Sequence, residues 1–224
     1  IHNNTKNDGR LRWKVPSSVA AGSAYTIKIT SKTNSGTTDS SDSNFTITKA
    51  GGSTVSKGGD YTYLNRHNAY KLDGQTVRWK SKTVQVSGAS GVWRAAVNLW
   101  PTVKFRHVSS PPADGKGIEI AGYDDIAGRC GVARVRYWNT CEMESCRIRV
   151  HSGHANMNCG SLADTITHEV GHCIGVINHT SDGGLMDATA ACGTNCAITS
   201  PVRNMINLLY SLAPGTNINS MLSR

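Results

Sequence analysis

The stretch Ser161–Gly175, SLADTITHEVGHCIG, is the most informative part of this chain. Ser161 followed by Asp164 resembles a capping box with Asp in place of the usual Glu, and it predicts that a helix begins there. At 100° per residue the apolar side chains of this helix fall on one stripe, which consists of Leu162, Ile166, Val170 and Cys173. The helix is therefore amphipathic, and Cys173 on the stripe is expected to be a buried thiol or half of a disulfide.

The same helix contains an HExxH motif formed by His168, Glu169 and His172. The two histidines lie about 40° apart around the helix axis, one turn from each other and away from the apolar stripe. Two neutral imidazoles at this spacing can bind one zinc ion and leave coordination positions open. Zinc lowers the pKa of a bound water to about 7, and Glu169 would accept a proton as that water attacks a carbonyl. The motif predicts a zinc hydrolase, and a surface helix with two solvated histidines is the alternative.

The residues after this helix offer a third metal ligand. Gly175 is the residue type that ends a helix in a left-handed conformation, so the chain can turn back towards the histidines. We expect His179 to be the third ligand, because an imidazole binds zinc better than an amide carbonyl does. The alternative ligands are Asn178, Asp182 and Asp187. Further along, Met186 lies in the tight turn Gly183–Asp187.

The combination of HExxHxxG, a following histidine and a methionine turn resembles the metzincin clan of zinc endopeptidases. Residues 168–182, HEVGHCIGVINHTSD, are most similar to a bacterial family named for its HEIGH motif, and matrixins are the second resemblance. Residues 92–105 resemble the first helix and strand of such catalytic domains. The resemblance implies an α+β fold, in which a twisted mixed sheet lies over the active-site helix and a C-terminal helix follows.

This resemblance also implies roles for single residues: Glu169 is the general base, Met186 forms the base of the metal site, and the zinc ligands are His168, His172 and His179. The sequence departs from the clan at two points. The clan's third histidine would stand at position 178, where this chain has Asn, so an extra residue must be absorbed as a bulge after the helix. The tyrosine that some metzincins place after the methionine is absent, because Asp187 and Ala188 follow.

The first 60 residues differ in composition from the rest, with 26 Ser, Thr or Gly. Residues 25–30 and 45–48 alternate apolar with polar side chains, as half-buried strands do. The span 13–47 resembles half of a Ser/Thr-rich β-sandwich module of wall-associated proteins, and a plain polar linker is the alternative. We expect a short β segment over 1–48, a Gly/Ser linker over 49–60 and a zinc metalloprotease catalytic domain over 61–224.

Within the expected catalytic domain, strands are predicted over 76–86, 104–108, around 118–120 and over 146–150. Helices are predicted over 91–100, with Val92, Ala95, Ala96 and Leu99 on one face, and from Pro201, with Val202, Met205, Ile206 and Leu209 on one face. The arginines of 146–150 alternate with apolar residues, which is typical of an edge or half-exposed strand. Such a strand could hold an extended peptide substrate.

All seven cysteines follow residue 129. The close pairs Cys141/Cys146 and Cys192/Cys196 suit disulfides in an exported protein. A Cys-rich zinc site is the alternative, although such sites favour CxxC pairs that this chain lacks. The connectivity stays open, and one thiol is left over because the number is odd. We expect a secreted, extracellular protein whose signal segment has been removed.

The formal charge of +9 is uneven along the chain. Residues 61–112 contain eight Lys or Arg against one acidic residue, whereas residues 161–224 contain two against four. The HExxH motif lies in the second stretch, so we interpret the positive charge as a solvated basic surface rather than a nucleic-acid site. No apolar run approaches the ~20 residues of a membrane-spanning helix.

Three further features are weaker candidates for functional sites. His151 and His154 form an HxxH that is either a second metal site or a pair of loop histidines near a cleft. Trp93 and Trp100 are expected to anchor the core rather than to bind substrate. Two acids, Asp124 and Asp125, are too few to argue for Ca²⁺.

We therefore expect a secreted zinc endopeptidase that acts on protein or peptide substrates, with cell-wall association through the N-terminal segment. Two alternatives remain. The chain could be a wall- or glycan-binding module with an inert HExxH region, or a zinc amidase that acts on a non-protein substrate.

Overall fold

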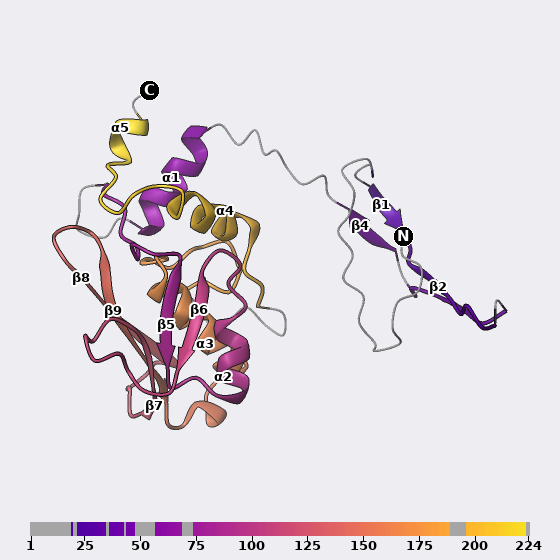
Figure 1. Ribbon diagram of the computed structural model, residues 1–224, viewed down its shortest axis with the longest axis horizontal. Coiled ribbons are helices and arrows are strands. Elements are labelled where there is room, and N and C mark those ends of the chain that lie inside the picture. The colour runs from indigo at the N-terminus through magenta and orange to yellow at the C-terminus, as the bar shows by residue number, and fades with distance from the viewer. Residues whose placement is uncertain are drawn as a thin grey trace. The chain divides into compact units, whose positions relative to one another are not determined.

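The computed structural model (Figure 1) describes residues 19, 22–34, 36–42, 44–47, 57–68, 74–188 and 196–222. The chain divides into an N-terminal unit, Ile1–Thr54, and a C-terminal unit, Val55–Arg224. In the N-terminal unit, strand β1 (Gly22–Tyr25) pairs antiparallel with β4 (Phe45–Ile47). Strand β2 (Lys28–Thr30) pairs antiparallel with β3 (Thr38–Ser40).

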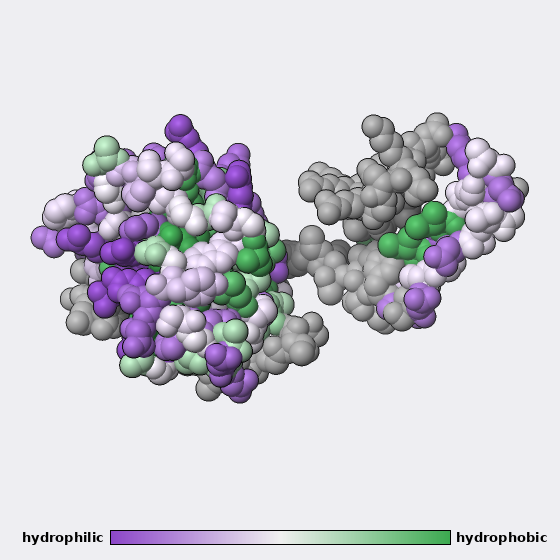
Figure 2. Space-filling model, turned by 90° about the horizontal axis from the view of Figure 1, so that it is seen from below, coloured by the Kyte–Doolittle hydropathy of each residue, from purple (hydrophilic) through white to green (hydrophobic). Residues whose placement is uncertain are grey.

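The predicted strand over 25–30 is therefore two strands that belong to different two-stranded sheets. Its isoleucines are not half-buried as predicted, because Ile27 is 40% and Ile29 is 65% exposed. Among the described residues of this unit, no second layer covers these sheets, so alternation alone does not bury one face. Figure 2 shows apolar surface on this unit.

The C-terminal unit is built on a mixed five-stranded sheet with the strand order β6-β5-β7-β9-β8. Its parallel strands are β5 (Thr83–Ser87), β6 (Lys104–Val108), β7 (Gly117–Asp124) and β9 (Met143–His151). Strand β8 (Gly131–Tyr137) lies antiparallel to β9 at one edge of the sheet. The fold class is α+β, as the sequence predicted.

Helices pack on this sheet and above its end (Figure 1). They are α1 (Lys57–Asn68), α2 (Gly91–Val97), α3 (Leu162–Cys173), α4 (Ser200–Leu209), α5 (Asn219–Leu222) and the 3₁₀ turn η1 (His154–Asn156). Helix α3 packs against β8, β9 and α2, and α1 packs against α4 and α5. None of the helices in the described part of the chain combines the length and apolar character that a membrane crossing requires.

Helices α3 and α4 agree with the sequence because their signals are local. The Ser161 side chain caps α3 by accepting a hydrogen bond of 3.0 Å from the Asp164 N–H. The apolar stripe of α3 is buried through Ile166, Val170 and Cys173. The apolar face predicted for α4 is buried as well, through Val202, Met205, Ile206 and Leu209.

Three predicted elements need correction. The predicted helix over 91–100 ends at Val97, and it buries Ala96 and Val97 rather than Val92 and Leu99, which are 47% and 59% exposed. The strand predicted over 76–86 begins only at Thr83, because residues before it form isolated bridges to other segments. Helix α1 begins at position 57, inside the stretch 49–60 expected to be linker, and α4 and α5 cover it.

The strand predicted over 146–150 is β9, which is an interior strand and not an edge. Its arginines alternate because they lie on the open face of the sheet, whereas Cys146, Ile148 and Val150 face the core. The edge position belongs to β8, which the sequence analysis did not single out. A peptide can therefore pair with β8 but not with β9.

The disulfides of the described residues link Cys130 with Cys159 and Cys146 with Cys173. The prediction that Cys141 pairs with Cys146 is wrong. Cys146 points to the core side of β9, where Cys173 on the apolar stripe of α3 lies 5.5 Å away between Cα atoms. Cys141 is free and buried. Cys196 is disulfide-bonded, and its expected partner Cys192 lies outside the described residues.

A buried amide at the end of α1 joins this helix to two other segments of the unit. The Asn68 side chain is fully buried, and its Nδ2 donates to the carbonyl oxygens of Val77, at 2.7 Å, and Gly175, at 2.8 Å. Its Oδ1 accepts a hydrogen bond of 2.8 Å from the Val77 N–H. Three backbone groups of two distant segments thus depend on one side chain.

Replacing Asn68 by Ala should lower the free energy of unfolding by about 2 kcal/mol or more, because it leaves buried backbone groups unsatisfied. Asn65→Ala on the same helix is the matched control, since the Asn65 side chain makes an exposed hydrogen bond of 3.1 Å to Asn219. That control should change stability by less than about 0.5 kcal/mol. Urea unfolding measures both, and equal losses would contradict the assignment.

Candidate metal centre

Three histidines converge on one point beside α3. His168 and His172 project from one face of that helix, and His179 comes from the segment that follows it. The Nε2 atom of His168 lies 3.1 Å from the Nε2 atoms of both His172 and His179. All three candidate ligand atoms lie within 4.8 Å of one another. In the part of the chain that the structure describes, this is the sole His, Cys, Asp and Glu cluster suited to a metal.

Backbone carbonyls determine which ring nitrogens carry hydrogen. The Nδ1 atom of His168 donates to the Leu185 carbonyl and that of His172 to the Val176 carbonyl, both at 2.5 Å. The Nε2 atoms of these rings therefore present lone pairs towards each other and towards His179. Lone pairs that face one another at 3.1 Å repel unless a cation lies between them, so this donor set fits a metal ion.

The pKa values of the ligand histidines agree with a neutral triad. Burial lowers the pKa of all three rings. For His172, burial and then the neighbouring His168 lower the pKa to about 3. Zinc binds the neutral imidazole, so the site does not have to release protons near neutral pH before a metal binds.

Gly175 turns the chain back from the end of α3. Its φ angle is +122°, and a Cβ at this position would lie 2.4 Å from Cδ2 of Leu209. Any side chain at this position would clash with Leu209, and the positive φ angle also favours glycine. The turn directs the following residues past the histidine face of α3.

Helix α1 orients the segment that supplies the third ligand. The Nδ1–H of His67 donates to the His179 carbonyl at 3.0 Å, and the Asn178 N–H donates to the His67 carbonyl at 2.9 Å. The Asn178 side chain points to the same helix, where its Nδ2 donates to the Arg66 carbonyl at 3.0 Å. Asn178 is thereby directed away from the cluster and His179 into it.

The two acidic alternatives for the third ligand have other partners. The Asp182 carboxylate accepts hydrogen bonds from Thr180, at 2.8 Å, and from the Tyr63 hydroxyl, at 3.2 Å. Asp187 lines the cleft, and its Oδ2 accepts a hydrogen bond of 3.1 Å from the Gly183 N–H. The structure brings neither acid into the cluster of the three histidines.

Met186, which the metzincin resemblance implies at the base of the metal site, packs against α3 at Gly171. It is buried, and a Cβ on Gly171 would lie 2.4 Å from its Sδ and 2.6 Å from Cζ2 of Trp100. The glycine inside the HEVGH motif therefore lets two large side chains pack directly against α3. Trp100 is a core residue whose Nε1 donates to the Thr167 carbonyl at 2.9 Å, which agrees with the predicted anchoring role.

Glu169 is buried beside the histidines, with 6% of its surface exposed. Burial raises its pKa to about 8, although a backbone hydrogen bond from Ala133 and the charge of Arg129 act in the opposite direction. The carboxyl group lies against β8, because a Cβ on Gly131 would lie 2.8 Å from its Oε1. The sequence analysis did not identify Gly131 and Ala133 as residues of the site, because no local pattern links β8 to α3.

A cleft of about 720 Å³ opens in front of these groups. Helix α3 and strand β8 form two of its walls, with Ala133, Val135 and Tyr137 on the strand side. Apolar side chains of Ile177 and Leu185 line it close to the histidines. A cleft that combines apolar side chains with convergent polar groups is typical of a ligand or substrate site.

The remaining candidates lie apart from this cluster. His151 Nδ1 accepts from the Gly153 N–H at 2.8 Å, and His154 Nε2 is hydrogen-bonded to the Thr165 hydroxyl at 2.9 Å. The HxxH pair therefore has separate local partners. Asp124 pairs with Arg149 and Asp125 lies 3.5 Å from His151, so each acid has a cationic or polar partner.

Replacing His179 by Ala should weaken zinc binding more than about 100-fold, because even residues that only support a ligand cost 10- to 100-fold. Asn178→Ala is the matched control and should keep one zinc per chain. Competition with a chromophoric chelator measures both affinities. A control variant that lost zinc while His179→Ala kept it would contradict the ligand assignment.

Zinc should also stabilise the folded chain. At a free concentration 100 times the dissociation constant, binding adds about 2.7 kcal/mol to the free energy of unfolding. We expect thermal unfolding to shift upward with zinc and downward with EDTA, and the shift should vanish in the double variant His168→Ala/His172→Ala. A zinc shift that persists in this variant would place the metal elsewhere.

No protein-family model matches this chain, and no curated protein matches it at a significant level. The resemblance to metzincins therefore rests on the sequence motif and on the methionine turn alone.

Proposed function

We propose that this chain is a zinc-dependent endopeptidase that hydrolyses peptide bonds in protein or peptide substrates. The observation that carries this proposal is the convergence of three imidazole nitrogens beside the buried carboxyl group of Glu169. Three histidine ligands are typical of catalytic zinc sites, which keep a coordination position open. The cleft in front of the cluster supports this interpretation, because it leaves room for a substrate.

His168, His172 and His179 would hold the zinc ion. When bound, zinc lowers the pKa of a coordinated water to about 7 and polarises the substrate carbonyl. The carbonyls of Leu185 and Val176 keep two of the rings in the ligating tautomer. Helix α1 holds the third ring in place through the hydrogen bond between His67 and the His179 carbonyl.

Glu169 is assigned as the general base. Its carboxylate oxygen would take a proton from the attacking water and pass it to the leaving amine nitrogen. In the metal-free chain, burial raises the pKa of Glu169 to about 8, so its carboxylate is a stronger proton acceptor than an exposed one. Gly131 allows the carboxyl group to stay close to β8, where the substrate chain would lie.

Strand β8 would hold the substrate chain. It is the last strand of the sheet, it lines the cleft, and its Ala133 backbone hydrogen-bonds Glu169 instead of a further strand. An extended peptide can add to such an edge through backbone hydrogen bonds, with alternate side chains directed into the cleft. This role replaces the one expected for residues 146–150.

An extracellular location is part of the same proposal. Disulfides persist in oxidising compartments and are rare in the cytosol. The bonds Cys130–Cys159 and Cys146–Cys173 both lie in the C-terminal unit, the second of them between β9 and α3. Disulfides in the unit that would perform catalysis support secretion.

Glu169→Gln should lower kcat for casein cleavage by about 10²- to 10⁴-fold, because it removes the proton acceptor. Zinc should still bind with one ion per chain, since Glu169 is not a ligand. Glu144→Gln on β9 is the matched control and should keep full activity. Zinc analysis together with release of labelled peptides from casein measures these outcomes.

Wild-type protein that binds zinc but cleaves neither casein nor peptides would contradict the endopeptidase proposal and favour the zinc amidase. Full activity of Glu169→Gln with zinc bound would contradict only the role of the glutamate. EDTA should abolish activity, and added zinc should restore it.

A further inference from the structure

The open face of the sheet carries four arginines on two neighbouring strands. Cys146 bonds to α3, so the alternate residues Arg147 and Arg149 of β9 point to the opposite face. Register places Arg134 of β8 opposite Arg147, and Arg136 opposite Ser145. Directly paired residues of antiparallel strands project on the same face, so Arg134 and Arg136 belong to this face too.

The charge on this face is only partly neutralised. Arg147 Nε lies 3.3 Å from the Glu119 carboxylate, and Arg149 pairs with Asp124. In the described part of the chain, neither Arg134 nor Arg136 has an acidic partner, and both are exposed. Like charges directly across a strand pair, as in Arg134 and Arg147, are destabilising. The edge strand thus keeps two guanidinium groups without acidic partners, although charge repulsion between neighbouring arginines lowers the stability of the sheet.

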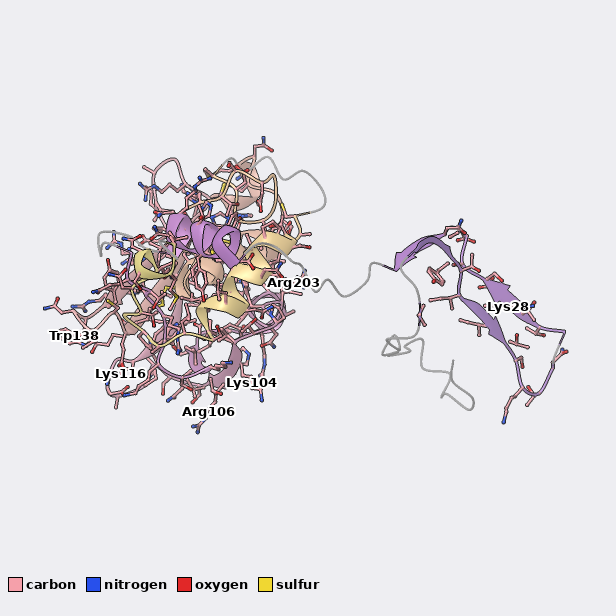
Figure 3. The ribbon with its side chains drawn as sticks, turned by 90° about the horizontal axis from the view of Figure 1, so that it is seen from above. Lys28, Lys104, Arg106, Lys116, Trp138 and Arg203 are labelled. Atoms are coloured by element: carbon pink, nitrogen blue, oxygen red, sulfur yellow. A yellow bond between two sulfur atoms is a disulfide. The ribbon has the colours of Figure 1, made fainter. Side chains whose placement is uncertain are left out.

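A hollow of about 370 Å³ lies beside these arginines. All four arginines line it, together with Lys116 and Ser145. Lys116 projects from the same side of the unit as Lys104 and Arg106 of β6, as Figure 3 shows. The hollow therefore offers a mainly cationic surface on the open face of the sheet, with Glu119 as an acidic residue in its lining.

We propose, on the basis of the endopeptidase function above, that Arg134 and Arg136 select substrates with acidic side chains at two alternate positions. A peptide that adds to the edge of β8 continues the pleat of the sheet, so half of its side chains lie on the open face. Those side chains lie about 4.5–5.5 Å, between Cβ atoms, from the residues opposite them on β8. The other half point to the side of Ala133 and Val135, which line the cleft.

An acidic peptide fits this surface better than a nucleic acid or another polyphosphate does. The two arginines are two residues apart on a strand, so their spacing of about 6.8 Å equals that of alternate side chains in an extended peptide. A planar guanidinium group also matches a carboxylate through two parallel hydrogen bonds. A polyphosphate cannot form the backbone hydrogen bonds that a peptide strand forms with the edge of β8. Its charges also do not repeat at the spacing of alternate side chains on a strand.

The experiment uses the full chain with zinc and a set of quenched fluorescent peptides. All peptides have one length and one scissile pair. The neutral peptide has Ser at the variable positions, and the acidic peptides have Glu at every second position in each of the two possible frames. Two further peptides have Lys at the same positions, and kcat/KM is measured for each.

We expect wild-type protein to cleave one acidic frame about 3- to 30-fold better than the neutral peptide, as two exposed ion pairs allow. The other frame should show no such preference, because its acids point into the cleft. Arg134→Glu/Arg136→Glu should lose the preference and favour Lys in the same frame. High salt should weaken both effects.

The matched control is Lys104→Glu/Arg106→Glu, which changes the net charge equally on the opposite edge strand, β6. It should keep the wild-type preference and frame. An equal effect of both double variants, or a preference without a frame, would overturn the proposal in favour of general electrostatic attraction. Inorganic polyphosphate that binds through Arg134 and Arg136 while peptides show no preference would overturn it in favour of a polyanion surface.

The experiment distinguishes a failure of the endopeptidase proposal from a failure of the proposed role of the two arginines. Absence of cleavage of every peptide by zinc-loaded wild-type protein contradicts the endopeptidase function itself. Cleavage of the neutral peptide with equal rates for all charged peptides leaves that function intact and overturns only the role of the two arginines.

Discussion

Three imidazole lone pairs that face one another impose the main constraint on this structure. The arrangement fits a cation between the rings, and hydrogen bonds from the surrounding chain restrict their rotation. Carbonyls of Leu185 and Val176 hold two rings from behind. The left-handed turn at Gly175 and the contact of α1 with the His179 carbonyl hold the third. Segments that are distant in the sequence thus position the three histidine rings.

The sequence predicted the helical half of the site because that half is local. Histidines four residues apart on an amphipathic helix must share a face, and the Ser161 cap sets where that helix begins. The choice between Asn178 and His179 is not local. It depends on which of two neighbouring side chains bonds to α1, and the Asn178 side chain does so by donating to the Arg66 carbonyl. The spacing of residues in the sequence cannot predict this hydrogen bond between Asn178 and α1.

The parts of the fold that sequence reasoning missed are those determined by pairing across the chain. Helix α1 has no clear apolar period and has two glycines in its first turn, so its helicity comes from packing against α4 and α5 rather than from its own pattern. An alternating strand has the same pattern in the interior of an open sheet as at its edge, so the sequence left both positions open for β9, which is half-exposed and interior. Cys146 bonds to Cys173 rather than to its near neighbour in sequence because both side chains face the core between β9 and α3.

In the proposed function, strand β8 would connect the chemistry of the site to the recognition of a substrate. Its inner face presents Gly131 and Ala133 to Glu169, so the position of the base depends on the backbone of this strand. Its outer face carries Arg134 and Arg136. A chain that pairs with the free edge must therefore present one row of side chains to the cleft and the other row to the arginines. Because a shift of one residue exchanges the two rows, a charge preference on the open face would also set which peptide bond reaches the metal centre.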